Sequence, residues 1–397
     1  MLTSLLLFAT AYAFLAERNV TTVSVENPTT ATEGFSSIVT VESSQVPVET
    51  ASTTATERTS APGPHGLAVG QTLSGLSQTA LDAEFDDLIT LGVGWIRFDI
   101  DWSEIQPNDN THFNWRNIDR IVAAAEARNI KLVATLGYTP WWARPESCFS
   151  NKCAPNEPSE FVRFVKAAVA RYAPKGLHYW EIWNEPNLAK FWQPAPSVSY
   201  YTLILQQSFE AIKNIDPRAI VISGGLAPTA TDDRNIAPLD FVERLYEDGG
   251  GEYFDALGFH PYSFPVPPSY TKVWNAWSQM HATTPSLRSI MIAYGDKDKK
   301  IWLTEFGAPT NGPGNLATLT NYTKVQQPSY VNEELQAYIL SEAFTLVEGY
   351  EWAGPLFWYS YKDLGTSSDT IENFFGLRRF DGSKKPAYMA LESLTER

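Results

Sequence analysis

The chain has 397 residues, which is enough for one large domain or for two or three ordinary ones. It carries 30 Lys and Arg against 45 Asp and Glu, and the net charge of −15 argues against a nucleic-acid partner or an anionic membrane surface. Hydrophobic residues at 44% are ample for a core, whereas two cysteines are too few for a disulfide scaffold or a Cys-based zinc site.

The first 64 residues differ in composition from the rest of the chain. Residues 1–16 are a short apolar run containing Ala11-Tyr12-Ala13, a small-x-small pattern typical of a signal-peptidase site. Residues 17–64 are rich in Ser, Thr and Pro, and cannot bury enough apolar area to offset the entropy lost on ordering. We therefore expect a signal peptide over 1–16 and a disordered linker over 17–64, either an O-glycosylated stalk or an unmodified pro-segment. The predicted location is secreted, in the extracellular space or the cell wall.

Two further features fit an extracellular protein. Cys148 and Cys153 lie five residues apart in a stretch rich in Pro, Ser and Asn, and in an oxidising compartment we expect them to form a disulfide. Sequons begin at Asn19 and Asn321, which predicts a glycoprotein.

Residues 65–397 show no second low-complexity break and are predicted to form one domain. Short apolar runs alternate there with amphipathic segments of helical length, such as Ile118–Asn129 and Tyr200–Asp216. The runs are Leu67–Gln71, Gly94–Asp99, Lys131–Leu136, His178–Trp183, Ala219–Ser223, Ala256–Phe259, Ile301–Thr304 and Leu356–Tyr359. Eight such repeats predict an α/β fold of the (β/α)8 TIM-barrel type. A doubly wound sheet is less favoured, because no Gly-rich phosphate turn follows the first run.

Two glutamates stand where strands of this barrel are expected to end. The fourth run leads into Asn184-Glu185-Pro186, and the seventh leads into Glu305-Phe306-Gly307. Active sites of the fold lie at the carboxyl ends of the strands, so both side chains are expected in one cleft. Two carboxyl groups facing a cleft provide the proton donor and the anion that glycosidic cleavage needs.

These motifs resemble glycoside hydrolase clan A, the retaining (β/α)8 glycosidases, and are most similar to family 39 and to the cellulase-type family 5. The likeness extends to Gly94–Asp99 with Asp101-Trp102, to His260-Pro261-Tyr262 and to Lys385–Tyr388. The resemblance implies that Glu185 is the general acid/base and Glu305 the nucleophile, with carboxyl groups about 5–5.5 Å apart. It also implies Asn184 at the sugar 2-hydroxyl, Arg97 and Tyr262 beside the Glu305 carboxylate, His260 in the wall of the site, and Trp358 as the platform of the −1 sugar.

Some residues keep two interpretations. Tyr138 and Trp141 follow the third run, where aromatic rings either bind sugar faces or fill the core of a loop. Arg97 either supports Glu305 or pairs inside the barrel with a residue such as Glu181, which alternation along the strand also points inward.

The sequence thus predicts a secreted retaining glycosidase, acting on β-glycosidic bonds of a poly- or oligosaccharide. No cofactor and no metal are expected, because His260 has no histidine at ligand spacing and no nucleotide motif occurs. We expect a monomer, and the open aromatic loops favour endo action. The alternative is a non-catalytic carbohydrate-binding or cell-wall protein on a barrel scaffold.

Overall fold

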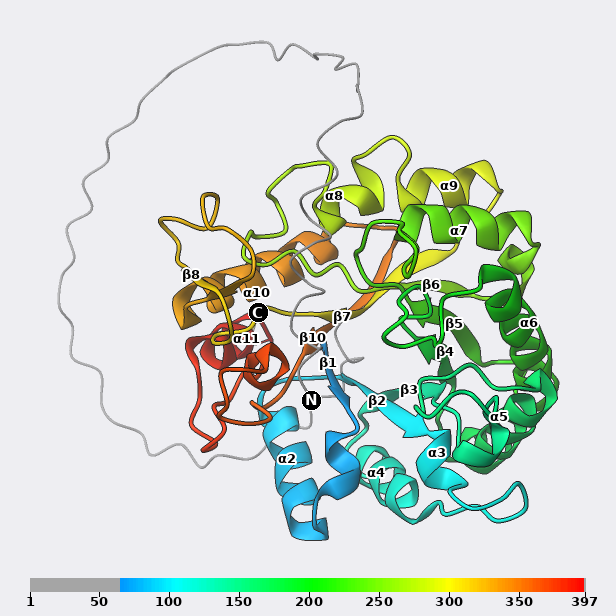
Figure 1. Cartoon of the computed structure of the whole chain (residues 1–397). Coiled ribbons are helices and arrows are strands. Elements are labelled where there is room, and N and C mark those ends of the chain that lie inside the picture. The colour runs from blue at the N-terminus through cyan, green and yellow to red at the C-terminus, as the bar shows by residue number, and fades with distance from the viewer. Residues whose placement is uncertain (1–64, 396–397) are drawn as a thin grey trace, which may run out of the picture. The chain divides into compact units, whose positions relative to one another are not determined.

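The computed structural model describes residues 65–395; the predicted signal peptide and Ser/Thr-rich linker lie outside the described residues. Eight parallel strands close into a barrel in the order β1-β10-β7-β6-β5-β4-β3-β2, with helices around it (Figure 1). The strands are β1 His65–Gly70, β2 Trp95–Asp101, β3 Lys131–Gly137, β4 Tyr179–Asn184, β5 Ile220–Gly225, β6 Ala256–Phe259, β7 Lys300–Phe306 and β10 Ala353–Tyr359. This confirms the predicted (β/α)8 barrel, with strand ends shifted by a few residues.

The helices follow the strands in chain order and begin at recognisable caps. They are α2 Gln78–Thr90, α3 Trp102–Ile105, α4 Arg116–Glu126, α5 Pro158–Tyr172, α6 Val198–Ile215, α7 Pro238–Glu247, α8 Ala276–His281, α9 Leu287–Ala293, α10 Glu333–Glu348 and α11 Pro386–Thr395. Ser77, Ser197 and Asn332 accept backbone N–H groups in the first turns of α2, α6 and α10, satisfying donors that a helix start leaves free. Between residues 65 and 395, none of these helices has both the length and the apolar character needed to cross a membrane.

The connection from β7 to α10 carries an addition to the simple barrel. It contains β8 Asn315–Ala317 and β9 Ser329–Val331, which pair as a small separate parallel sheet. These three-residue strands were not predicted, because runs of that length carry too little periodicity to be read from sequence.

Alternation along the strands divides the core into two layers, as β2 illustrates. Ile96, Phe98 and Ile100 belong to the outer apolar cluster shared with the helices. Burying each such side chain stabilises the fold by roughly 1.5–3 kcal/mol. Trp95 points the other way, into a smaller cluster drawn from strands around the barrel. Its buried members are Ala68, Trp95, Val133, Ile222, Ala256, Trp302 and Phe357.

This interior cluster forms a plug beneath the carboxyl ends of the strands. Arg97, Asp99 and Asp101 follow Trp95 at intervals of two on β2, so they share its inward face. The interior therefore changes from aromatic to charged along the strand. Charged side chains collect at the end of the barrel where the sequence predicted the site.

Candidate active site

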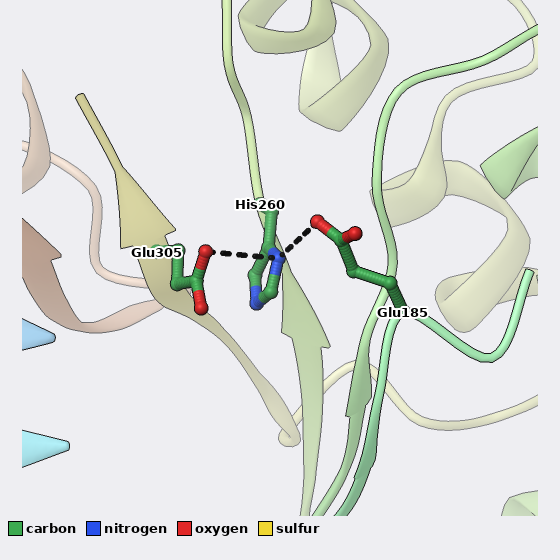
Figure 2. A group of neighbouring side chains, drawn as sticks. All are labelled: Glu185, His260 and Glu305. Atoms are coloured by element: carbon green, nitrogen blue, oxygen red, sulfur yellow. Dashed lines mark hydrogen bonds and ion pairs between the residues drawn. The ribbon is translucent and has the colours of Figure 1, made fainter. Parts of the chain in front are cut away.

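The two predicted glutamates meet at the carboxyl ends of β4 and β7. Glu185 directly follows β4 and has a left-handed backbone with φ of 45°, while Glu305 is the penultimate residue of β7. One carboxylate oxygen of each, together with a ring nitrogen of His260, form a group of atoms within 4.8 Å of one another. Figure 2 shows His260 between the two carboxylates. A non-glycine residue at positive φ is uncommon and costs of order 1–3 kcal/mol, which the surrounding barrel must offset.

Arg97 connects the nucleophile candidate to the floor of the site. Its guanidinium is fully buried and donates from Nη1 to Glu305 Oε1 over 2.6 Å. It also donates from Nε to Glu181 Oε2 over 2.6 Å and from Nη2 to Asn184 Oδ1 over 2.8 Å. Both interpretations of Arg97 therefore hold at once, since it supports Glu305 and pairs with Glu181. Because Arg97 occupies the oxygen of Asn184, the amide NH2 is the group left to donate to a sugar hydroxyl.

Glu305 is surrounded by groups that stabilise its anion. Tyr262 donates its hydroxyl to Glu305 Oε2 over 2.9 Å. Burial by itself raises the pKa of Glu305, but His260, Arg97 and the Tyr262 hydrogen bond together bring that pKa below its ordinary value. Burial and the nearby Glu305 charge raise the pKa of Tyr262 well above its usual range, so this phenol stays a neutral donor. The site thus holds one carboxylate ionised.

His260 is fully buried, and its Nδ1 lies 3.0 Å from Glu185 Oε1 and 3.7 Å from Glu305 Oε2. The ring fits because position 225 is glycine: a Cβ there would stand 2.1 Å from His260 Nε2 and 2.6 Å from Thr304 Oγ1. Neither of these two buried atoms has a hydrogen-bond partner among residues 65–395.

The same three side chains could hold a metal ion by geometry alone, although the sequence predicted no metal. The charge of Arg97 beside these side chains favours catalysis over metal binding. The Arg97 guanidinium already neutralises Glu305 at 2.6 Å, so a dication would add to a fixed positive charge. One ionised carboxylate beside a second carboxyl group is instead what acid–base and nucleophilic catalysis requires.

Tyr138 and Trp141 have different environments at the end of β3. Tyr138 is buried, and its hydroxyl donates to Asp99 Oδ2 over 3.3 Å. Trp141 begins the 3-10 helix Trp141–Ala143 and is 65% exposed. Tyr138 therefore belongs to the wall of the barrel mouth, while the Trp141 ring is available to a ligand.

The assignment of Trp358 as the sugar platform is wrong. This residue is fully buried in the outer apolar cluster, where its ring packs against Phe306 and its Nε1 donates to the Phe375 carbonyl. Its neighbours Phe357 and Tyr359 belong to or pack on the interior cluster, so alternation turns Trp358 outward. Tyr359 faces the site instead: its pKa is raised first by burial and then by the charge of Glu305.

Sequence reasoning also missed Asp99 and Lys152 as parts of the site. Asp99 is buried, and burial raises its pKa to about 6. Lys152 places its ammonium 3.1 Å from the centre of the Tyr138 ring, and burial lowers its pKa to about 8. The alternation of β2 after Arg97 could have revealed Asp99, whereas the position of Lys152 depends on the path of a loop.

Comparisons with known proteins identify the family and the fold. The family model "Cellulase (glycosyl hydrolase family 5)" matches residues 66–339. A β-xylosidase from Geobacillus stearothermophilus is 30% identical over 162 residues, covering 36% of this chain and 32% of the xylosidase. The chain thus matches about a third of that relative.

Solved structures show the same fold. A family 39 glycoside hydrolase from Bacteroides cellulosilyticus superposes with a TM-score of 0.63 at 21% identity, covering 84% of this chain and 64% of the other. A family 5 enzyme from Streptomyces cattleya, solved with GlcNAc, has a TM-score of 0.59 at 17% identity, with coverages of 84% and 80%. The family match spans most of the barrel and includes both glutamates, so the chain belongs to glycosyl hydrolase family 5 and thereby to clan A, as its motifs predicted.

Proposed function

We propose that this protein is a secreted retaining β-glycosidase in which Glu185 is the general acid/base and Glu305 the nucleophile. The observation that carries the proposal is the closeness of the two carboxyl groups, whose oxygens come within 4.8 Å beside Arg97. Retaining enzymes hold their carboxyl groups about 5–5.5 Å apart, whereas inverting enzymes leave about 6.5–9.5 Å for a water molecule.

The first step uses the different electrostatic environments of the two glutamates. Glu185 donates its proton to the glycosidic oxygen while Glu305 attacks the anomeric carbon, forming a glycosyl ester and releasing the aglycone. Arg97 and Tyr262 hold Glu305 ionised and oriented before attack. The Asn184 amide donates to the sugar 2-hydroxyl, a contact expected to strengthen in the transition state.

In the second step Glu185 acts as a base. It removes a proton from water, the water attacks the anomeric carbon, and Glu305 leaves as a carboxylate. The Nδ1 atom of His260 lies near both carboxylates, so the ring stays beside Glu185 while the charge of Glu185 changes between the two steps. Tyr359 provides the aromatic surface at the end of β10 that was expected from Trp358.

Substrate and location follow from separate observations. A poly- or oligosaccharide is the proposed substrate class, and the β-xylosidase relative makes β-xylosides a reasonable first choice. The apolar residues 1–16 and the Cys148–Cys153 disulfide support work outside the cell. A non-catalytic role is disfavoured, because both carboxyl groups are present close to each other and Arg97 still pairs with Glu305.

The configuration of the first product tests the proposal. We expect hydrolysis of an aryl β-glycoside to release the β-anomer first, with the α-anomer arising later by mutarotation. Proton NMR of the anomeric signals during the first minutes distinguishes the two. Initial release of the α-anomer would mean a single displacement by water and would remove Glu305 from the nucleophile role.

A further inference from the structure

The segment between β3 and α5, residues 138–157, is fixed in place and is called here the β3–α5 loop. The disulfide between Cys148 and Cys153 closes its tip. Arg144 ties the tip to the start of the loop, donating from Nε to the Thr139 carbonyl over 2.7 Å and from Nη1 to the Phe149 carbonyl over 3.2 Å. The Thr139 amide also donates to the Asn151 carbonyl over 2.8 Å. The loop is therefore a preorganised element.

The inner side of the β3–α5 loop is part of the barrel mouth. Asn151 donates from Nδ2 to Asp101 Oδ2 over 3.3 Å, and Asp101 also accepts from Gln71 Nε2 over 2.6 Å. The Lys152 ammonium lies over Tyr138, within electrostatic range of Asp99, Asp101 and Glu185. This side presents amide, ammonium and carboxylate groups, which are the hydrogen-bonding partners that sugar hydroxyls use.

The same loop carries two uncovered aromatic rings. Phe149 is 90% exposed and Trp141 is 65% exposed. No other ring or cation among residues 65–395 packs on either of them. A single exposed apolar residue is ordinary, but two large exposed rings on one loop whose other residues line the barrel mouth indicate a binding surface.

We propose that Phe149 and Trp141 form a distal platform for a polysaccharide chain that extends out of the catalytic cleft. This inference rests on the proposed function. A sugar ring has an apolar face that packs on an aromatic ring and a rim of hydroxyl groups that bind polar side chains, and residues of this loop offer both. Because the disulfide and the Arg144 hydrogen bonds fix the loop backbone, little backbone entropy is lost when the chain binds. The platform makes the enzyme prefer long chains.

The test compares a polymer with a small substrate, using the full chain. The variants are Phe149→Ala, Trp141→Ala and Phe380→Ala; Phe380 is 51% exposed, lies outside the loop and serves as the control. The polymer is whichever of soluble xylan, mixed-linkage β-glucan and glucomannan the wild type cleaves fastest. On that polymer we expect Phe149→Ala and Trp141→Ala to lower kcat/KM roughly 10-fold by raising KM. On an aryl β-glycoside, which reaches only the catalytic residues, all three should match the wild type.

Affinity electrophoresis in gels containing the same polysaccharides separates this inference from the proposed function. The polymer should retard the wild type and Phe380→Ala more than the two loop variants, and the Cys148→Ser/Cys153→Ser variant should resemble the loop variants. Equal retardation and equal polymer KM in all proteins would overturn the platform. If neither polymer nor aryl glycoside is cleaved, the hydrolytic proposal fails, and the gel result still decides whether the loop binds saccharide.

Discussion

Replacing Glu305 with Ala is expected to lower kcat on every glycoside substrate by a factor on the order of 10⁴ or more, because the group that attacks the anomeric carbon is lost. Azide is expected to enter the vacated space and displace the aglycone in one step, giving an α-glycosyl azide from a β-glycoside. Steady-state rates with and without azide, followed by NMR of the product, provide the measurement.

Glu243→Ala is the matched control, since this exposed glutamate lies on the outer helix α7 and touches no residue of the site. It should keep wild-type kcat. The nucleophile assignment fails if Glu305→Ala retains activity comparable to this control, or if its azide product has the β configuration.

Replacing Glu185 with Ala is expected to lower kcat by about 10²–10⁴, the usual contribution of a general acid or base. The loss should depend on the substrate. A dinitrophenyl glycoside needs little protonation of its leaving group, so formation of the glycosyl-enzyme should change least with that compound. Azide should then attack the glycosyl-enzyme on Glu305 and yield a β-glycosyl azide, the opposite configuration from the Glu305 variant.

The pH profile offers a second reading of the same variant. The part of the kcat/KM profile that belongs to the acid/base should be present in the wild type and absent in Glu185→Ala. Glu185→Gln, which keeps the shape of the side chain but cannot release a proton at neutral pH, should behave in the same way. An α-glycosyl azide from the Ala variant would show that the two glutamates have been assigned in the wrong order.

The barrel could be predicted from sequence because its signals are local and repeated. Each strand is a short apolar run, and each helix a longer amphipathic one, so the order of elements fixes the fold class. The rule that parallel strands present their carboxyl ends to one cleft then predicts, from the sequence alone, that Glu185 and Glu305 lie together. The disulfide between Cys148 and Cys153 was predicted from spacing and is confirmed.

The details of the site depended on information that the sequence does not carry locally. Phe357, Trp358 and Tyr359 are three consecutive aromatic residues, so composition gives no sign of which face the barrel interior. Packing against the interior cluster determines which of these side chains point into the barrel, and it places Tyr359 rather than Trp358 at the site. The left-handed backbone of Glu185 likewise reflects tertiary constraint, not local preference.

The position of Lys152 illustrates a second limit. Its ammonium reaches the Tyr138 ring because hydrogen bonds and a disulfide route the β3–α5 loop back over the barrel mouth. No spacing rule links a residue in such a loop to a strand end. Sequence patterns therefore locate the catalytic pair, whereas the surroundings that set substrate choice require the folded chain.

The proposed mechanism depends on a covalent bond between Glu305 and the sugar, and trapping that bond tests the mechanism most directly. The enzyme should be inactivated by a 2-deoxy-2-fluoro-β-glycoside with an activated leaving group, which slows breakdown of the glycosyl-enzyme more than its formation. Mass spectrometry of a protease digest should find the fluoroglycosyl group on the peptide that contains Thr304, Glu305 and Phe306. A label on Glu185 or on a residue outside the cleft, or rapid turnover of the reagent with inverted product, would contradict the mechanism.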